Sequence, residues 1–104
     1  MFTVLESRGT TLTVLLTGEI DHHCAGKIRD EIDAAIEHHR PESLILDFGG
    51  VSFMDSSGIG LILGRAECCE KMSIQLVIRG LSGRVGMLIR MSGVGKIRCI
   101  KLEA

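Results

Sequence analysis

Several features that binding proteins commonly use are absent from this sequence. It has no Trp, no Tyr and three Phe among 104 residues, so it lacks the stacking platforms typical of single-stranded nucleic-acid binders. Its 12 basic and 13 acidic residues give a net charge of −1 without a basic stripe. No apolar run approaches the length of a membrane span. The first residues lack the basic segment followed by an apolar segment that is typical of a signal peptide. We therefore expect no direct nucleic-acid partner and no membrane insertion.

Metal-binding and disulfide patterns are also missing. The four cysteines are Cys24, Cys68, Cys69 and Cys99, and none of them forms a Cys-x-x-Cys pair. We interpret them as free, mostly buried thiols in a reducing cytoplasm. Adjacent histidines, as in the pairs at 22–23 and 38–39, point in different directions on regular structure, and no cysteine is suitably spaced beside them. The sequence therefore predicts no metal site and no cofactor.

Hydrophobic residues make up 45% of the chain, which is enough for the core of one domain over residues 1–104. Apolar patterns and turn residues predict strands at 2–6, 11–17, 43–47, 73–78 and 96–102. Helical spacing predicts helices from Ala25 to before Pro41, from about Ser57 to Glu70, and from about Ser82 to Met91. The order ββαβαβαβ predicts an α/β fold, in which helices pack on a mixed sheet whose first two strands are antiparallel and whose later strands are parallel.

Each of these helices has a predicted apolar face. The residues expected on the inner face of the first helix are Ala25, Ile28, Ile32, Ala35 and Ile36. The residues expected on the inner face of the second helix are Ile59, Ile62, Leu63, Ala66 and Cys69. Those expected on the inner face of the third helix are Val85, Leu88 and Ile89.

The run Asp55-Ser56-Ser57-Gly58 is the most informative segment, because it joins a buried strand to the second helix. Free N–H groups and the helix dipole favour a negative group at such a helix N-terminus. A serine there can cap the helix, attack a substrate or receive a phosphate, and capping is the default interpretation. Phe53 and Met54 come just before, so we expect an apolar docking patch beside an exposed hydroxyl.

Two alternatives from other functional classes are less favoured by the residues. A serine hydrolase needs a base, and His22 or His23 is a candidate for it, but no Gly-x-Ser-x-Gly elbow is present. A nucleotide-binding module needs a glycine-rich phosphate loop. The glycines of 58–64 are spaced one residue too widely for the dinucleotide fingerprint, and Gly93–Lys96 lacks the rest of a P-loop. We therefore expect no catalytic turnover from the chain alone.

Three segments resemble the STAS-domain anti-sigma factor antagonists. They are Leu16–His23, Leu46–Arg65 around Asp55-Ser56-Ser57-Gly58, and Met91–Ile97. The segment Gly-Glu-Ile-Asp-His-His at 18–23 narrows the resemblance to the sporulation branch of the family. The predicted order of strands and helices is also similar to that of the family, so the resemblance covers nearly the whole chain. It implies a STAS-type mixed sheet and regulated binding instead of catalysis.

By this resemblance, the unphosphorylated protein binds an anti-sigma factor that is also a serine kinase, and so frees a sigma factor. The kinase uses ATP to phosphorylate the serine after the motif aspartate, here Ser56, and a membrane-associated serine phosphatase reverses this. The docking surface is expected to include Asp21, Met54, Asp55, Ser57 and Gly58. The free chain is expected to be a cytoplasmic monomer. A STAS-type nucleotide-binding or other phospho-regulated interaction module stays open as an alternative.

Two finer expectations concern the geometry of this loop. Ser56 is expected to cap the second helix or to lie just outside it, with Ser57 as the first helical residue. Gly58 is expected to leave room for the approaching kinase.

Overall fold

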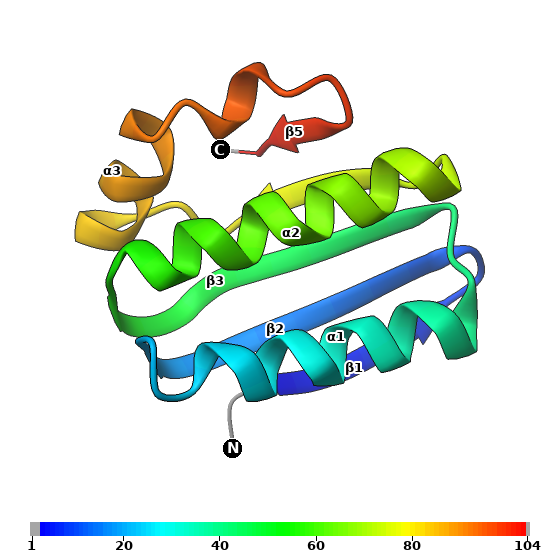
Figure 1. The fold of residues 1–104 in the computed structure, drawn as a ribbon, viewed down its shortest axis with the longest axis horizontal. Helices are drawn as coiled ribbons and strands as arrows, with labels where there is room; N and C mark the ends of the chain where they lie inside the picture. The colour runs from blue at the N-terminus through cyan, green and yellow to red at the C-terminus, as the bar shows by residue number, and fades with distance from the viewer. Residues whose placement is uncertain (1–2, 104) are drawn as a thin grey trace.

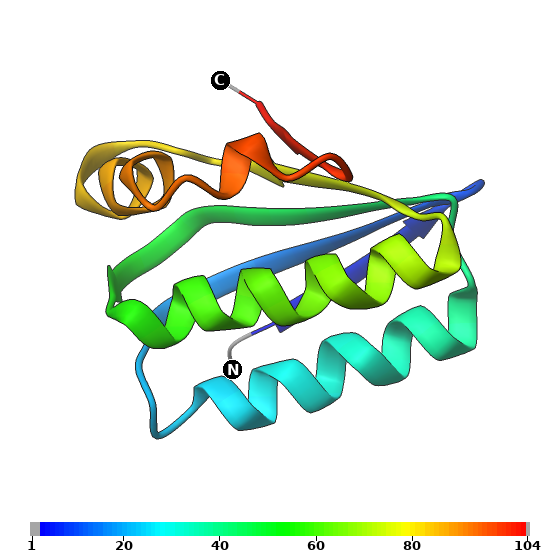
Figure 2. The same ribbon diagram turned by 45° about the horizontal axis from the view of Figure 1, so that its top comes forward.

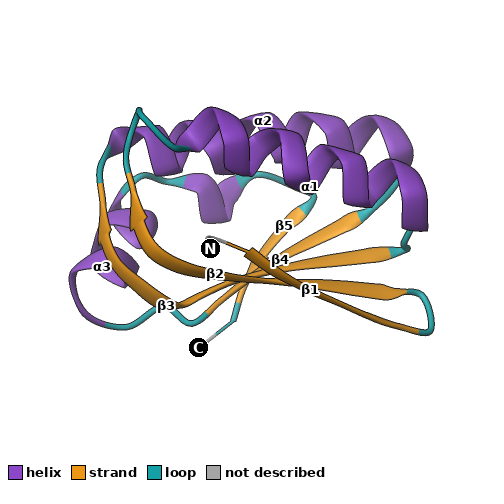
Figure 3. Ribbon diagram, turned by 90° about the horizontal axis from the view of Figure 1, so that it is seen from below, coloured by secondary structure: helices purple, strands orange, loops and turns teal. Residues whose placement is uncertain are grey.

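The computed structural model describes residues 3–103 and shows helices packed on a twisted sheet (Figure 1). The strands are β1 (Thr3–Arg8), β2 (Thr11–Ile20), β3 (Ser43–Met54), β4 (Gln75–Arg79) and β5 (Ile100–Leu102). The helices are α1 (Ala25–His39), α2 (Ser56–Met72) and α3 (Gly83–Met91), followed by the short 3-10 helix η1 (Val94–Lys96). The helices α1 and α2 lie side by side over one face of the sheet, and α3 lies on the other side of β3 (Figures 2 and 3).

The strand order in the sheet is β1-β2-β3-β4-β5. The pair β1–β2 is antiparallel, and the three pairs that follow are parallel, as the sequence predicts. The last residues of β2 and β3, Ile20 and Met54, are partners in the ladder. The loops that follow these two strands therefore leave the sheet side by side, at the carboxyl edge where parallel sheets carry their sites.

The strand β3 is longer than predicted, because it continues through Gly49 and Gly50 to Met54 instead of ending at Asp47. The pairing of β3 with β2 continues to Met54 through two register shifts, one between Leu15 and Thr17 and one between Gly18 and Glu19 of β2. In a regular strand every second side chain faces the same side, but each shift adds one residue to β3. The side chains of Phe48, Val51 and Met54 are therefore all buried although they are three residues apart. Gly50 is needed at the first shift, since a Cβ there would lie 2.9 Å from Thr17 Cγ2 and 3.0 Å from the Leu16 carbonyl oxygen.

The last strand is shorter than predicted. Residues 94–96 form η1, so β5 begins at Ile100 instead of Lys96. The side chain of Val94 is buried and anchors this turn to the core. The remaining elements match their predicted ranges to within a few residues, which is the usual uncertainty of helix and strand ends.

The buried face of helix α2 overlaps the predicted one but is shifted towards α1. Its buried residues are Gly58, Leu61, Ile62, Arg65, Ala66 and Cys69. Ile62, Ala66 and Cys69 are buried as predicted, and the half-buried Ile59 packs against the core. Leu63 is exposed, so that prediction is wrong. The segment is apolar on several sides, and the neighbouring α1 decides which side is covered, since α1 packs beside Leu61 and Arg65.

In α3, Val85 and Ile89 are buried as expected, whereas Leu88 is half-buried.

The cysteines are all free, but only Cys69 is buried. Cys24, Cys68 and Cys99 are half-buried, which corrects the expectation that the thiols are mostly buried. Within residues 3–103, no helix has the length and apolar character needed to cross a membrane.

Candidate functional site

The loops after β2 and β3 bring the two predicted aspartates to the same edge of the sheet. Asp21 is the first residue after β2 and Asp55 is the first after β3. The backbone N–H of Asp55 donates to the carbonyl oxygen of Ile20 at 3.2 Å, which ties the two loops together. Residues that are 34 positions apart in the sequence therefore form one candidate site.

Asp55, and not Ser56, caps α2. Its backbone is extended, its Oδ1 accepts a hydrogen bond from Ser57 N at 2.8 Å, and its carbonyl oxygen accepts one from Gly58 N at 3.0 Å. The helix begins at Ser56, one residue earlier than predicted. The expectation that Ser56 caps the helix or lies outside it is therefore wrong, because Asp55 already satisfies the free N–H groups that a cap serves.

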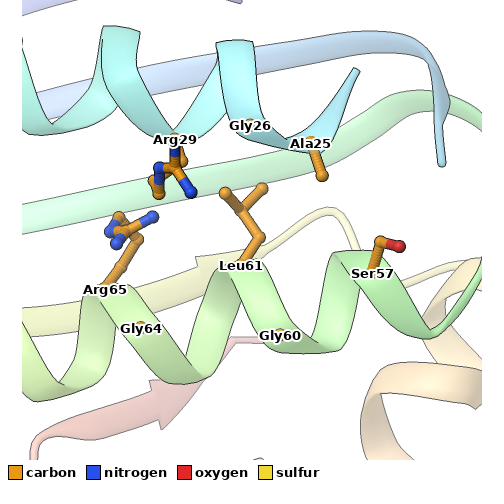
Figure 4. A pocket seen from close by; sticks show the side chains of 8 residues that line it. All are labelled: Ala25, Gly26, Arg29, Ser57, Gly60, Leu61, Gly64 and Arg65. Carbon is orange, nitrogen blue, oxygen red and sulfur yellow. The ribbon is translucent and has the colours of Figure 1, made fainter. Parts of the chain in front are cut away.

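Ser56 is exposed, and its hydroxyl forms no hydrogen bond within residues 3–103. It stands in the first turn of α2, where the helix dipole favours a negative group. Ser57 is half-buried and lines a groove between α1 and α2 (Figure 4). Of the two serines, Ser56 is the one that an approaching enzyme reaches more easily.

The carboxylate of Asp21 closes the turn that leads to α1. Its Oδ1 accepts hydrogen bonds from His23 N at 3.0 Å and from Cys24 N at 3.2 Å. Partial desolvation raises the pKa of Asp21, but the hydrogen bonds from Cys24 and His23 outweigh it, so the pKa is lowered from its ordinary value of 3.8. Asp21 is therefore a fixed negative charge beside Asp55 at neutral pH.

Within residues 3–103, no histidine or carboxylate side chain accepts a hydrogen bond from the hydroxyl of Ser56 or Ser57. The rings of His22 and His23 lie with their centroids 4.0 Å apart, and neither ring forms a hydrogen bond within the part of the chain that the structure describes. In residues 3–103, no three His, Cys, Asp or Glu side chains are grouped so as to hold a metal ion. The site therefore offers a hydroxyl and two carboxylates, without the base that a serine nucleophile needs.

Met54 and Gly58, at the junction of β3 and α2, are both largely buried. Met54 is 7% exposed, and Gly58 is buried. A Cβ on Gly58 would lie 2.2 Å from Met54 Sδ and 2.3 Å from Met54 Cγ. Gly58 thus leaves room for Met54 of its own chain. That it also leaves room for an approaching kinase stays a prediction.

An exposed apolar groove of about 510 Å³ lies beside the site, between the end of β3 and α3. Its lining residues are Ser52, Phe53, Met54, Arg84, Val85, Met87, Leu88 and Met91. Phe53, Met87 and Met91 are 50%, 59% and 79% exposed. The patch expected near residue 53 is therefore present, but α3 supplies five of its eight lining residues. The i, i+4 spacing of Met87 and Met91 was the sequence signal that could have indicated this contribution.

Comparison with known proteins identifies the family of the chain. The STAS domain matches residues 3–103 of the chain. The chain belongs to the STAS-domain family. An anti-sigma F factor antagonist from Paenibacillus polymyxa is 36% identical over 93 residues, which cover 89% of this chain and 80% of that protein.

Solved structures of relatives share the fold of this STAS domain. The unphosphorylated form of the anti-sigma factor antagonist SpoIIAA is 30% identical with a TM-score of 0.75, and the match covers 98% of this chain and 87% of that one. The phosphorylated form of the Bacillus cell fate determinant SpoIIAA is 32% identical with a TM-score of 0.73, and the match covers 98% of this chain and 91% of that one. This STAS domain is thus similar to SpoIIAA in both of its phosphorylation states.

Proposed function

We propose that this STAS domain is an anti-sigma factor antagonist that is switched off by phosphorylation at Ser56. The unphosphorylated form binds an anti-sigma factor, itself a serine kinase, and so releases a sigma factor. A serine phosphatase restores the active form. The observation that carries the proposal is the exposed Ser56 hydroxyl at the N-terminus of α2, next to the capping Asp55, in a chain similar to anti-sigma F factor antagonists.

The partner is proposed to dock on the edge formed by Asp21, Asp55 and Ser57, together with the apolar groove beside it. The groove supplies apolar contact area, and methionines adapt well to a partner surface. Met54 lines this groove and Gly58 packs against Met54 at the start of α2, so both belong to the proposed docking surface. The free chain acts as a cytoplasmic monomer without catalytic turnover of its own.

Phosphorylation is expected to change binding more than fold. It adds about −1.5 to −2 charge to a serine at neutral pH. The helix N-terminus attracts the phosphate by about 0.3–1 kcal/mol. The capping carboxylate of Asp55 repels it, and the two effects oppose each other. The fold of the phosphorylated chain is therefore expected to change little.

Across an interface the balance is different. An acidic partner group about 5 Å away, at an effective dielectric near 20, repels each unit of charge by roughly 3 kcal/mol. That energy corresponds to roughly a hundredfold loss of affinity, which is enough for a switch. The switch then needs an acidic group on the partner and no rearrangement within this chain.

The acceptor serine is tested by incubating the chain with its cognate anti-sigma kinase and ATP, and mapping the phosphate by mass spectrometry. Ser56→Ala should still bind the kinase and resist phosphorylation, since it removes the acceptor and leaves the Asp55 cap in place. Its stability should stay within about 0.5 kcal/mol of the parent protein. Ser57→Ala is the matched control and should be phosphorylated normally. The proposal fails if Ser56→Ala is fully phosphorylated, or if a folded Ser57→Ala blocks the reaction.

A further inference from the structure

The four methionines that the structure describes fall into two groups. Met87 and Met91 are 59% and 79% exposed. Met54 is 7% exposed, and Met72 is half-buried and packs against the core. The first two thioether side chains are therefore open to reagents in solution, whereas the other two are shielded to different degrees by the fold.

The exposed pair lies on the apolar groove beside the proposed docking edge. Met87 and Met91 are four residues apart on α3, so their side chains are neighbours on one face of the helix. Both line the groove with Phe53, where α3 lies beside the end of β3 (Figure 3). The buried residues of α3 are Val85, Gly86 and Ile89. The two methionines therefore belong to the surface of the groove and do not hold α3 on the sheet.

An exposed thioether is a substrate for hydrogen peroxide. A lone pair of the sulfur attacks one peroxide oxygen, so that an S–O bond forms and the O–O bond breaks. The hydroxide that leaves takes the remaining proton from the new S–OH group and departs as water. The sulfur loses two electrons and the peroxide gains them, so the reaction needs no base, metal or cofactor from this chain.

The product changes the chemistry of the groove. Methionine sulfoxide is polar, whereas the thioether it replaces is apolar. In the free chain the new oxygens stay in water, because both side chains are exposed. Under an apolar partner surface they lose that water, which is costly unless a donor replaces it. Oxidation therefore opposes docking and leaves the fold intact.

We propose that Met87 and Met91 form an oxidation site, at which hydrogen peroxide weakens binding of the anti-sigma factor independently of the phosphate on Ser56. The inference rests on the proposed function, because the groove is part of the proposed docking surface. The change is reversible, since methionine sulfoxide reductases restore the thioether.

The first part of the test measures which methionines react. The unphosphorylated chain is treated with hydrogen peroxide, its thiols are reduced again, and the sulfoxides are mapped by mass spectrometry of the peptides. Met87 and Met91 should be oxidised before Met72, and Met54 should be oxidised last, with an unchanged melting temperature. In denaturing urea all four should react alike. Oxidation of Met54 as fast as Met91 in the folded chain would overturn the proposal.

The second part measures the affinity of the cognate anti-sigma factor for the chain before and after oxidation. Oxidation should weaken binding at least about tenfold, and reductase treatment should restore it. The double variant Met87→Leu, Met91→Leu should bind as the parent does and should keep its affinity after peroxide treatment. The matched control Met72→Leu should lose affinity as the parent does.

The two proposals fail in different ways. No binding of the untreated parent to the anti-sigma factor would refute the proposed function. Binding by the untreated parent that persists unchanged after Met87 and Met91 are fully oxidised would refute the oxidation site alone. An equal loss of affinity in the parent and in the double leucine variant would also refute it, since the effect would then come from other residues.

Discussion

At the scale of single residues, Asp55 has two roles that other acidic residues of the chain do not combine. Its side chain caps α2 through Ser57 N, and its carbonyl oxygen accepts the bond from Gly58 N. It also places a negative charge next to the proposed acceptor serine. The sequence shows three capping residues in a row, and only the structure shows that the first of them is the cap.

Removing this cap should destabilise the protein without changing its fold. Asp55→Ala loses the hydrogen bond to Ser57 N, and the free energy of unfolding should fall by about 1 kcal/mol, within a range of roughly 0.5–2 kcal/mol. Asp55→Asn is the matched control, because asparagine caps as well as aspartate while removing the charge. Urea denaturation of the three proteins measures the difference. Equal stability of the Ala and Asn variants would show that the cap does not matter.

The carboxyl of Asp21 should titrate below its ordinary pKa of 3.8, because the hydrogen bonds from Cys24 and His23 outweigh the partial desolvation that raises it. A lowered pKa in the folded state means that the carboxylate form is stabilised by folding. The stability it contributes is present above the unfolded pKa and is lost as the pH falls through the folded pKa. NMR titration of the Asp21 side chain measures this directly. Cys24→Ala should move the pKa back towards 3.8, and titration of the parent at or above 3.8 would contradict the assignment.

At the scale of the element, α2 carries glycines with opposite roles. Gly58 faces Met54, with too little space for a side chain, whereas a Cβ on Gly60 meets nothing within 4 Å. The sequence shows both as helical glycines in one apolar segment and does not distinguish them. The distinction depends on the two register shifts of β3, which bring Met54 back to the core side and over Gly58.

These two glycines give a matched pair of substitutions. Gly58→Ala should lower the free energy of unfolding by about 1–3 kcal/mol, because the buried Met54 side chain has to move. Gly60→Ala should raise it by up to about 1 kcal/mol, because alanine is the better helix former and meets no neighbour. Thermal and urea unfolding of both variants test this. Destabilisation by both, or by neither, would mean that the packing of Met54 on Gly58 is not as described.

At the scale of the whole molecule, the order and direction of the strands follow from the sequence, because the alternation of strands and helices dictates parallel neighbours. The position of Asp21 and Asp55 at one edge of the sheet also follows, because the carboxyl ends of parallel strands lie at the same edge. The parts that were mispredicted depend on contacts between distant segments. The exact buried face of α2 depends on α1, and the apolar groove depends on where α3 meets the end of β3. Periodicity within one segment indicates an apolar face but does not say which other segment covers it.

The core as a whole should protect one thiol from modification. Burial, with the neighbouring thiols of Cys68 and Cys99, raises the pKa of Cys69 to about 12, so very little reactive thiolate forms near neutral pH. In iodoacetamide labelling at pH 8, Cys24 and Cys68 should react first, and Cys69 should react only through global unfolding. In denaturing urea all four cysteines should label alike. Labelling of Cys69 as fast as Cys24 in the folded protein would contradict the packing of α2 on the core.

The central claim is that a phosphate on Ser56 weakens partner binding by its charge. Calorimetric titration of the cognate anti-sigma factor with the chain, before and after complete phosphorylation at Ser56, tests it most directly. The account predicts an affinity loss of at least about a hundredfold with an unchanged fold, and a smaller loss for Ser56→Asp, which has about half the charge. Ser56→Ala should bind as the parent does. Affinities equal within twofold for the unphosphorylated and fully phosphorylated chains would contradict the account.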